Sequence, residues 1–150
     1  MPISVSSMLG LQTRFKVTVD GVDLGGWSKC TGLAVEFKTK TVNEGGNYEY
    51  QPILAEKIEY NKIVLERAMN AQDSARVQGW LRSKVSSWMN GMSSGGGGTA
   101  QITLLDSHLE PVASWSLRNV YPSKWDGPTL NVTTFGVAME TLTLVHEGFL

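Results

Sequence analysis

The sequence is poor in the residues on which most site chemistry depends. It has one cysteine and two histidines among 150 residues, and only 18% of its residues are charged, against about 25% in an average domain. A single cysteine cannot form an internal disulfide, and no Cys or His group has the spacing of a zinc site. The sequence contains no run of about 18 apolar residues, so it predicts no membrane span. Met1 to Gln12 contain neither Lys nor Arg, so we expect no secretory signal there.

The charge balance also lacks a dominant sign. Thirteen basic and fourteen acidic residues give a formal net charge of -1, and they form no block that would bind nucleic acid or an anionic membrane. Cys30, the single cysteine, fits a reducing compartment. The length predicts one domain over residues 1–150. Low charge together with five tryptophans indicates a surface that contacts other proteins.

Several segments have the alternating pattern of β-strands. Thr13 to Asp20 predicts a half-buried strand, which the Asp20-Gly21 pair ends in a hairpin-type turn. Leu24 to Phe37 predicts a long second strand in which Gly32 marks a bulge or a close backbone approach. The further strands are expected at Ile58 to Arg67, at Thr99 to Asp106, around Ala113 to Leu117, and at Phe135 to His146, where a change of phase between Met139 and Leu142 suggests a bulge or burial on both faces.

One helix is predicted from about residue 73 to residue 90. Asp73 is a good cap, Gly91 is placed to end the helix, and the apolar residues recur at three-and-four spacing. The expected buried stripe is Val77, Trp80, Leu81, Val85, Trp88 and Met89. Met92 to Gly98 predicts a flexible loop. One helix among about six strands predicts a mainly β, β-rich α+β fold, a small antiparallel barrel or sandwich with one flanking helix.

The segment from about residue 38 to residue 57 has little core periodicity. Glu44, Gly45, Gly46 and Asn47 predict a turn, beside which Tyr48, Tyr50, Ile53 and Leu54 stand as isolated large side chains. Compact domains use connections of about 2 to 6 residues. A stretch from about residue 38 to residue 57 is much longer, so it predicts a projecting arm that is either disordered alone or packed on a partner.

The residues capable of site chemistry do not converge in the sequence. His146 and Glu147 are neighbours in a strand, so their side chains point to opposite faces. His108 lies in a predicted turn with Asp106 and Glu110, and Cys30 has no histidine near it in the chain. Gly95 to Gly98 lack the Lys-Ser/Thr pair and the following helix of a phosphate loop. We therefore expect no catalytic, cofactor or metal site. An enzyme with its active site at a barrel mouth is kept only as the weakest alternative to the structural roles considered below.

Six short motifs, in order along almost the whole chain, resemble the tail-tube family of contractile phages and phage-derived injection systems. They are Phe15 to Gly21 (FKVTVDG), Trp27 to Leu33 (WSKCTGL) followed by Glu36, Glu44 to Asn47 (EGGN), Ile63 to Arg67 (IVLER), Trp115 to Pro122 (WSLRNVYP) with Lys124 and Trp125, and Glu140 to Gly148 (ETLTLVHEG). No single motif is specific, but their order and spacing form a joint signal.

This resemblance implies a structural role. It implies a small β-barrel flanked by a helix, assembled as hexameric rings that stack into a hollow tube inside a contractile sheath, with a lumen for payload passage. It implies that the arm, including Glu44, Gly45, Gly46, Asn47, Tyr48, Tyr50, Ile53 and Leu54, reaches a neighbouring ring. The implied partners are further copies of the chain and sheath, baseplate and tape-measure proteins. The implied location is an injection particle or phage tail assembled in the bacterial cytoplasm, without a cofactor.

Two departures leave the subtype open. Many relatives continue with Lys-Arg-Gly where this chain has Glu66, Arg67 and Ala68, and the glycine-rich loop at residues 93–98 is unusual. The alternatives are a tube-initiating baseplate protein, which shares the core and the arm, and a secreted ring protein similar to the haemolysin-coregulated protein of type VI secretion. Neighbouring genes would separate the last of these from a phage-like system.

Overall fold

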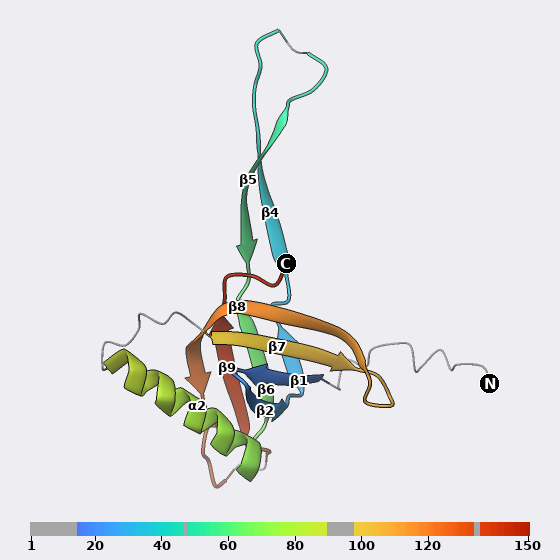
Figure 1. The fold of residues 1–150 in the computed structure, drawn as a ribbon. Coiled ribbons are helices and arrows are strands. Elements are labelled where there is room, and N and C mark those ends of the chain that lie inside the picture. Colours follow the sequence, from blue (N-terminus) through green and yellow to red (C-terminus); the bar gives the residue numbers. More distant parts are fainter. Residues whose placement is uncertain (1–14, 47, 90–97, 134–135) are drawn as a thin grey trace, which may run out of the picture.

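A computed structural model describes residues 15–46, 48–89, 98–133 and 136–150. The described residues form nine strands and one helix, arranged as a curved sheet, a separate two-stranded hairpin and a helix against the sheet (Figure 1). The elements are β1 (Phe15–Val19), β2 (Val22–Gly26), β3 (Lys29–Thr31), β4 (Val35–Thr41), β5 (Ile53–Tyr60), β6 (Ile63–Ala68), α2 (Ala71–Met89), β7 (Gly98–Leu105), β8 (Pro111–Asp126) and β9 (Met139–Val145).

The first predicted strand is confirmed from Phe15 to Val19, while Thr13 and Arg14 lie outside the described residues. Phe15, Val17 and Val19 on β1 point into the core, and Lys16 between them is exposed. The chain then turns at Asp20 and Gly21, whose φ values of 52° and 77° place both residues in the left-handed region that Asp-Gly turns require. β1 consequently pairs with β2 on one side and with β7 on the other.

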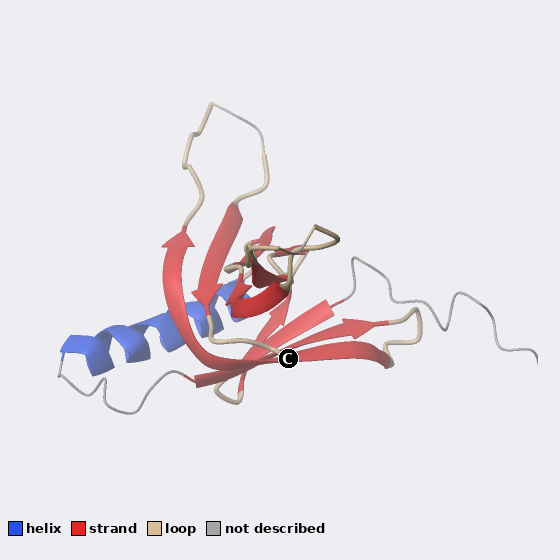
Figure 2. Cartoon of the chain, turned by 90° about the horizontal axis from the view of Figure 1, so that it is seen from above, coloured by secondary structure: helices blue, strands red, loops and turns tan. Residues whose placement is uncertain are grey.

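Seven strands form one antiparallel sheet in the order β2-β1-β7-β8-β9-β6-β3. The long strand β8 joins its two halves, because Pro111 to Val120 pair with β7 and Tyr121 to Asp126 pair with β9. At the change of partner, Asn119 has a φ of 51°. Figure 2 shows β8 bending strongly, so that one strand carries the sheet around the core.

The sheet rolls up without closing. Its edge strands β2 and β3 are separated in the chain by only Trp27 and Ser28, and no ladder joins them among the described residues. The mainly β class is confirmed, with an open roll in place of a closed barrel. The single long strand predicted over Leu24 to Phe37 is wrong, because the chain changes partner from β1 to β6 at Trp27 and leaves the sheet at Gly32.

The helix is confirmed, but its cap and its buried face differ from the prediction. Asn70, and not Asp73, caps the helix: its side-chain oxygen accepts from the Asp73 amide at 2.7 Å. Val77 and Trp80 are buried, and the Trp80 Nε1–H donates to Asp20 in the β1–β2 turn at 3.1 Å. The outer half of the predicted stripe, Val85, Trp88 and Met89, is exposed. Gly91 and the predicted loop up to residue 97 lie outside the described residues.

The core contains a buried ion pair. Arg67 on β6 and Glu140 on β9 are 2% and 0% exposed, and their Nε and Oε2 atoms are 3.6 Å apart. Arg67 also donates hydrogen bonds to the carbonyls of Leu24 and Gly26. Its guanidinium carbon lies 3.9 Å from the centre of the Trp27 ring. The Ser74 hydroxyl of α2 donates a hydrogen bond to Glu140. This group ties β2, β6, β9 and α2 together.

Glu140 also corrects the last predicted strand. β9 pairs with β6 from Met139 to Leu144 in unbroken register, so the predicted bulge between Met139 and Leu142 does not exist. The apparent change of phase arises because a charged residue, Glu140, occupies an inward position beside Leu142 and Leu144. Phe135, where the strand was predicted to begin, lies outside the described residues.

Candidate assembly surfaces

The hairpin of β4 and β5 projects from the sheet as an arm (Figure 1). We call residues 35–60 the arm. The predicted arm of residues 38–57 falls within it, but the structure extends regular strand pairing from Val35 to Thr41 and from Ile53 to Tyr60. The single strand predicted over Ile58 to Arg67 is therefore two strands, which are separated at Asn61 and Lys62 where the arm returns to the sheet.

One face of the arm is apolar. Phe37 lies directly opposite Ile58, and Val35 lies opposite Tyr60, so these four side chains share a face. The register shifts after Lys38 and leaves Glu56 as an extra residue in β5. Because of this bulge, Ala55 and Ile53 return to the face of Phe37. Phe37, Ile53 and Ile58 are each more than half exposed.

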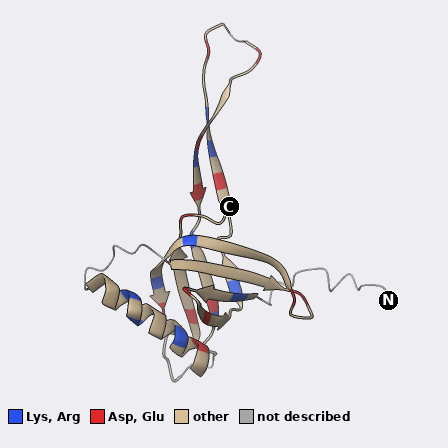
Figure 3. Ribbon diagram, in the orientation of Figure 1, with Lys and Arg blue, Asp and Glu red and all other residues tan. Residues whose placement is uncertain are grey.

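The opposite face of the arm is charged. Glu36 lies opposite Glu59, and Lys38 lies opposite Lys57, so like charges face each other in two bands, visible along the arm in Figure 3. Neighbouring bands neutralise each other: Lys38 lies 2.9 Å from Glu36, and Lys57 lies 2.9 Å from Glu59. Glu36 raises the pKa of Lys38, and Lys57 lowers the pKa of Glu59. These pairs are exposed and contribute little to stability.

The tip of the arm contains the predicted turn. Gly45 and Gly46 form a turn in which Gly46 has a φ of 87°, and Asn47 lies outside the described residues. Below the turn, the Val42 amide donates to the Pro52 carbonyl at 2.9 Å. Tyr48 is 98% exposed. The remaining predicted residues, Glu44, Tyr50, Ile53 and Leu54, are also exposed.

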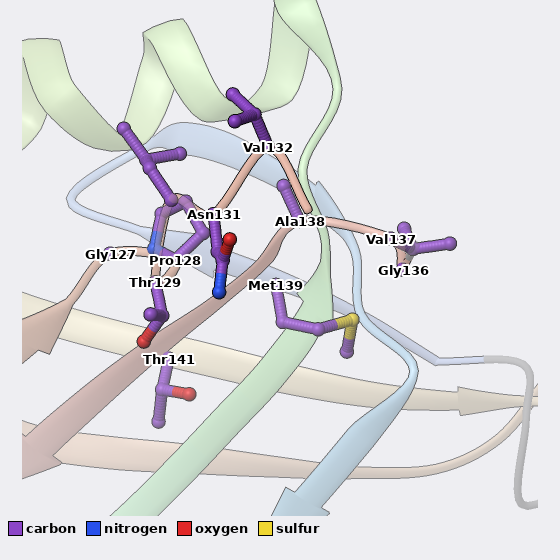
Figure 4. Close-up of a pocket in the computed structure, with 11 residues that line it drawn as sticks. Gly127, Pro128, Thr129, Asn131, Val132, Gly136, Val137, Ala138, Met139 and Thr141 are labelled. Atoms are coloured by element: carbon purple, nitrogen blue, oxygen red, sulfur yellow. The ribbon is translucent and has the colours of Figure 1, made fainter. Parts of the chain in front are cut away.

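A groove of about 830 Å³ lies at the connection from β8 to β9 (Figure 4). In Figure 1 this connection is at the end of the molecule opposite the arm. The groove is formed by the connection from β8 to β9 and the start of β9, and none of the described residues that line it is charged. Leu130 and Val132 are 86% and 103% exposed, and Val137 is exposed as well. We call this feature the β8–β9 groove.

The outer half of α2 is a third exposed apolar surface. Val85, Trp88 and Met89 face solvent, and the ring of Trp88 lies 6.3 Å from the ring of Tyr121 on β8. The helix therefore packs on the sheet through its first half and carries its second half beyond the core.

The side chains considered for chemistry remain apart. Burial raises the pKa of the Cys30 thiol to about 11, which opposes formation of the reactive thiolate. Burial lowers the pKa of His146, whose Nε2 lies 3.1 Å from the Asn61 carbonyl, while Glu147 accepts from Asn119. The His108 amide donates to Asp106 within its turn. The described residues contain no group of three or more potential metal ligands.

Sequence reasoning missed two of these surfaces. Phe37 and Ile58 were assigned to sheet strands, although the alternation of Val35 with Phe37 and of Ile58 with Tyr60 could have indicated a second, amphipathic strand pair. The sequence patterns predicted no groove between β8 and β9. The feature that could have indicated the groove is the run from Gly127 to Met139, which contains no charged residue. Leu130 and Val132 make this run apolar as well as uncharged.

The described part of the chain contains no helix with the length and apolar character needed to cross a membrane. A comparison with curated proteins found no match. A comparison with family models matched residues 11–150 to the T4-like virus tail tube protein gp19 family.

Three solved structures of two injection particles contain chains with a similar fold. A chain in the anti-feeding prophage (AFP) baseplate, solved with 6-fold symmetrisation, has a TM-score of 0.69 and 23% identity, covering 93% of this chain and 92% of that one. A chain of the AFP tube-terminating cap has a TM-score of 0.71 and 18% identity, covering 99% and 93%. A chain of the PVC sheath-tube complex, an extracellular contractile injection system in its extended state, has a TM-score of 0.67 and 17% identity, covering 97% and 88%.

Proposed function

Because this chain belongs to the T4-like virus tail tube protein family, we propose that it is the repeating subunit of an inner tube, assembled as stacked hexameric rings around a lumen through which payload passes. The observation that carries the proposal is the family match over residues 11–150, which takes in the sheet, the helix and the arm together. The chain is accordingly a structural component of a phage tail or injection particle and not an enzyme.

The arm supports the stacking part of the proposal. Its apolar face, which includes Phe37, Ile53 and Ile58, has no cover within the described part of the chain. An isolated two-stranded hairpin is only marginally stable in water, and exposed apolar area of this kind is typical of a surface that is buried in an assembly. We propose that it is buried against a neighbouring ring.

The open sheet edges support the ring part of the proposal. β2 and β3 are the edge strands of the seven-stranded sheet in the described part of the chain. Arg67 satisfies the Leu24 and Gly26 carbonyls of β2, and pairing with a neighbouring subunit would extend the sheet at such an edge. The similar chain in the AFP baseplate belongs to a 6-fold symmetrised assembly, which supports a sixfold ring. Sheath, baseplate and tape-measure proteins are the partners that such a tube requires, and bacterial cytoplasm is the proposed place of assembly.

A second candidate is a tube-initiating baseplate protein, which the likeness to a chain of the AFP baseplate favours. Electron microscopy and mass photometry of the purified protein distinguish the two. A tube subunit is expected to form sixfold rings and long stacks of them at tens of micromolar, whereas an initiator is expected to form single rings. A strictly monomeric protein without rings or tubes would contradict both.

A further inference from the structure

We propose that residues 146–150 form a pH-sensitive strap at the base of the arm, which the neutral ring of His146 holds closed and which protonation of that ring opens. The strap follows β9 and lies against the point where Tyr60 ends β5 (Figure 1). It belongs to the single subunit, whatever the arm contacts in an assembly.

The two ring nitrogens of His146 have partners of opposite kinds. Nε2 lies 3.1 Å from the Asn61 carbonyl oxygen, which can only accept a hydrogen bond. The Gly148 amide donates to Nδ1 at 3.0 Å, so Nδ1 is an acceptor. The neutral ring with its proton on Nε2 satisfies both partners, whereas the imidazolium would turn an Nδ1–H toward the Gly148 N–H. Protonation therefore breaks the bond between His146 and Gly148.

The strap packs against the last residue of the arm. The centre of the Tyr60 ring lies 5.1 Å from that of Phe149 and 5.5 Å from that of His146. Gly148 is buried between these rings and β8 with a φ of 137°, and a Cβ there would approach the Tyr60 ring to 2.7 Å. Phe149 also packs against the hydrophobic core. The strap thus connects the base of the arm to the core.

Strand β8 holds the other side of the strap. The Arg118 amide donates to the Gly148 carbonyl at 2.9 Å, and the Arg118 carbonyl accepts from the Glu147 amide at 2.8 Å. The guanidinium of Arg118 donates to the backbone oxygen of Leu150. None of these bonds uses the His146 ring. A change in the charge of that ring consequently acts first on the side of the strap that faces the arm.

The surroundings of His146 disfavour its charged form. Burial of the ring and, secondly, the positive charge of Arg118 lower the pKa of His146, which the Asn61 carbonyl partly offsets. When the strap opens, the ring enters water, where the pKa of histidine is roughly 6.5. The opened strap therefore binds a proton more readily than the closed one. The closed strap keeps its full stability above about pH 6.5 and loses it as the pH falls toward the lower pKa of the closed form.

The remaining ionisable groups around the strap do not reverse this preference. Besides Tyr60 and Arg118, they are Glu147 of the strap itself and Lys62, which follows Asn61 and is exposed. Glu147 accepts a hydrogen bond from the side chain of Asn119 at 2.7 Å. The acidic residues near the base of the arm, Glu36 and Glu59, lie on the face opposite Tyr60 and pair with Lys38 and Lys57.

Hydrogen exchange, followed by mass spectrometry on the whole chain, tests the strap. Lowering the pH from about 7.5 to about 5.5 should raise the opening constant by about tenfold, because the opened ring then takes up a proton. After correction for the intrinsic pH dependence of exchange, the protection of the Glu147 and Gly148 amides should fall by that factor. Protection at residues 58–60 should fall with it, while that of β1 stays constant. The measurement needs no rings or tubes, so its outcome is independent of the proposed function.

The two histidines of the chain provide matched variants. His146→Asn keeps an oxygen that can accept from the amide two residues later, as in an Asx-turn, but it does not titrate. The protection of the Gly148 amide should then change by less than about twofold between the two pH values. His108 is exposed in the turn between β7 and β8, and His108→Asn should keep the full response. A response of less than about twofold in the unmodified protein, its persistence in His146→Asn, or its loss in His108→Asn would overturn the proposal.

Phe149→Ala separates the strap from the proton. It removes the ring that packs on Tyr60 and leaves both hydrogen-bonding partners of His146 in place. Protection at residues 58–60 should fall already at neutral pH, while the amides of β1 exchange as before. If residues 58–60 exchange at the same rate in Phe149→Ala as in the unmodified protein, the strap does not hold the arm and the proposal is wrong.

Discussion

Strands β5 and β6 follow one another in the chain and use similar residues, but the structure covers only one of them. Ile63, Leu65 and Arg67 of β6 are buried, whereas Ile53, Leu54 and Ile58 of β5 are more than half exposed. The alternation of side chains predicts a strand in both places. Whether an apolar face becomes core depends on how many strands the sheet supplies around it, and β5 has a single neighbour, β4.

The same contrast has an energetic side. We call the seven-stranded sheet and α2 the body. Burying one large aliphatic side chain contributes about 1.5 to 3 kcal/mol to stability, so the buried residues of the body, including those of β6, can stabilise its fold without a partner. The arm obtains almost none of this within the chain. Mutations in the body should therefore lower the free energy of unfolding, and mutations in the arm should affect assembly.

The largest effect is expected at the buried ion pair of the body. Glu140→Leu would remove the fully buried partner of Arg67 and leave only the partly buried Asp73, 3.8 Å away, as a counter-charge, and we expect the free energy of unfolding to fall by about 3 to 5 kcal/mol, as measured by urea denaturation. Arg67→Met together with Glu140→Leu should recover most of the loss, because both charges are then removed. An equally unstable double variant would show that steric fit, and not charge, governs this position.

The buried and the exposed parts of α2 offer a comparison within one helix. Trp80→Ala should cost about 3 to 5 kcal/mol, because it removes a buried aromatic side chain, and its 5% exposure contrasts with the 53% of Trp88. Trp88→Ala should cost less than about 1 kcal/mol in the isolated subunit. Thermal unfolding of both variants measures the difference, and similar losses would place the outer half of the helix in the core.

The turn at the arm tip should divide folding from assembly. Gly45→Val combined with Gly46→Val forces a side chain into the left-handed conformation of Gly46, at a cost of about 1 to 2 kcal/mol that falls on the arm alone. The body should unfold at nearly its normal temperature, while electron microscopy shows rings without tubes. Global unfolding would mean that the arm belongs to the core, and normal tubes would mean that it has no part in stacking.

The smallest effect on the isolated subunit is expected at Phe37. Phe37→Ser removes an exposed ring from the apolar face of the arm, so the free energy of unfolding should change by less than about 0.5 kcal/mol. Tube formation should nonetheless require a higher protein concentration, which sedimentation measures. Lys40→Ser on the opposite face is the control. Equal effects of the two substitutions on assembly would argue against one-sided burial of the arm.

Local patterns predicted the parts of the fold that depend on local structure. The alternation of Phe15, Val17 and Val19, the spacing of Val77 and Trp80, and the polar turn at Gly45 and Gly46 each located an element, and the order of short motifs identified the family. The position of the arm was found for the same reason, since a segment without core periodicity had no place in a core.

The errors arose where distant residues decide the structure. The breaks at Trp27 and at Asn61 occur because the chain changes sheet partners there, which no local period records. Glu140 looked like a break in phase because its partner, Arg67, lies far away in the chain. The exposure of Trp88 depends on how far the sheet extends beneath the helix. The groove was missed because an uncharged connection has no pattern of its own.

The register of β3 and β6 shows how the arm is attached. Thr31 pairs with Val64, so β3 and β6 are the two strands of a hairpin, and the whole arm occupies the position of its loop. At this junction Gly32 lies so close to the Lys62 carbonyl that a Cβ would approach the oxygen to 1.8 Å. The arm is thus an insertion at one point of the fold, and we expect that a short turn could replace it without disturbing the body. The length of the arm and the stability of the sheet could then change independently, because the arm joins the rest of the fold at a single junction.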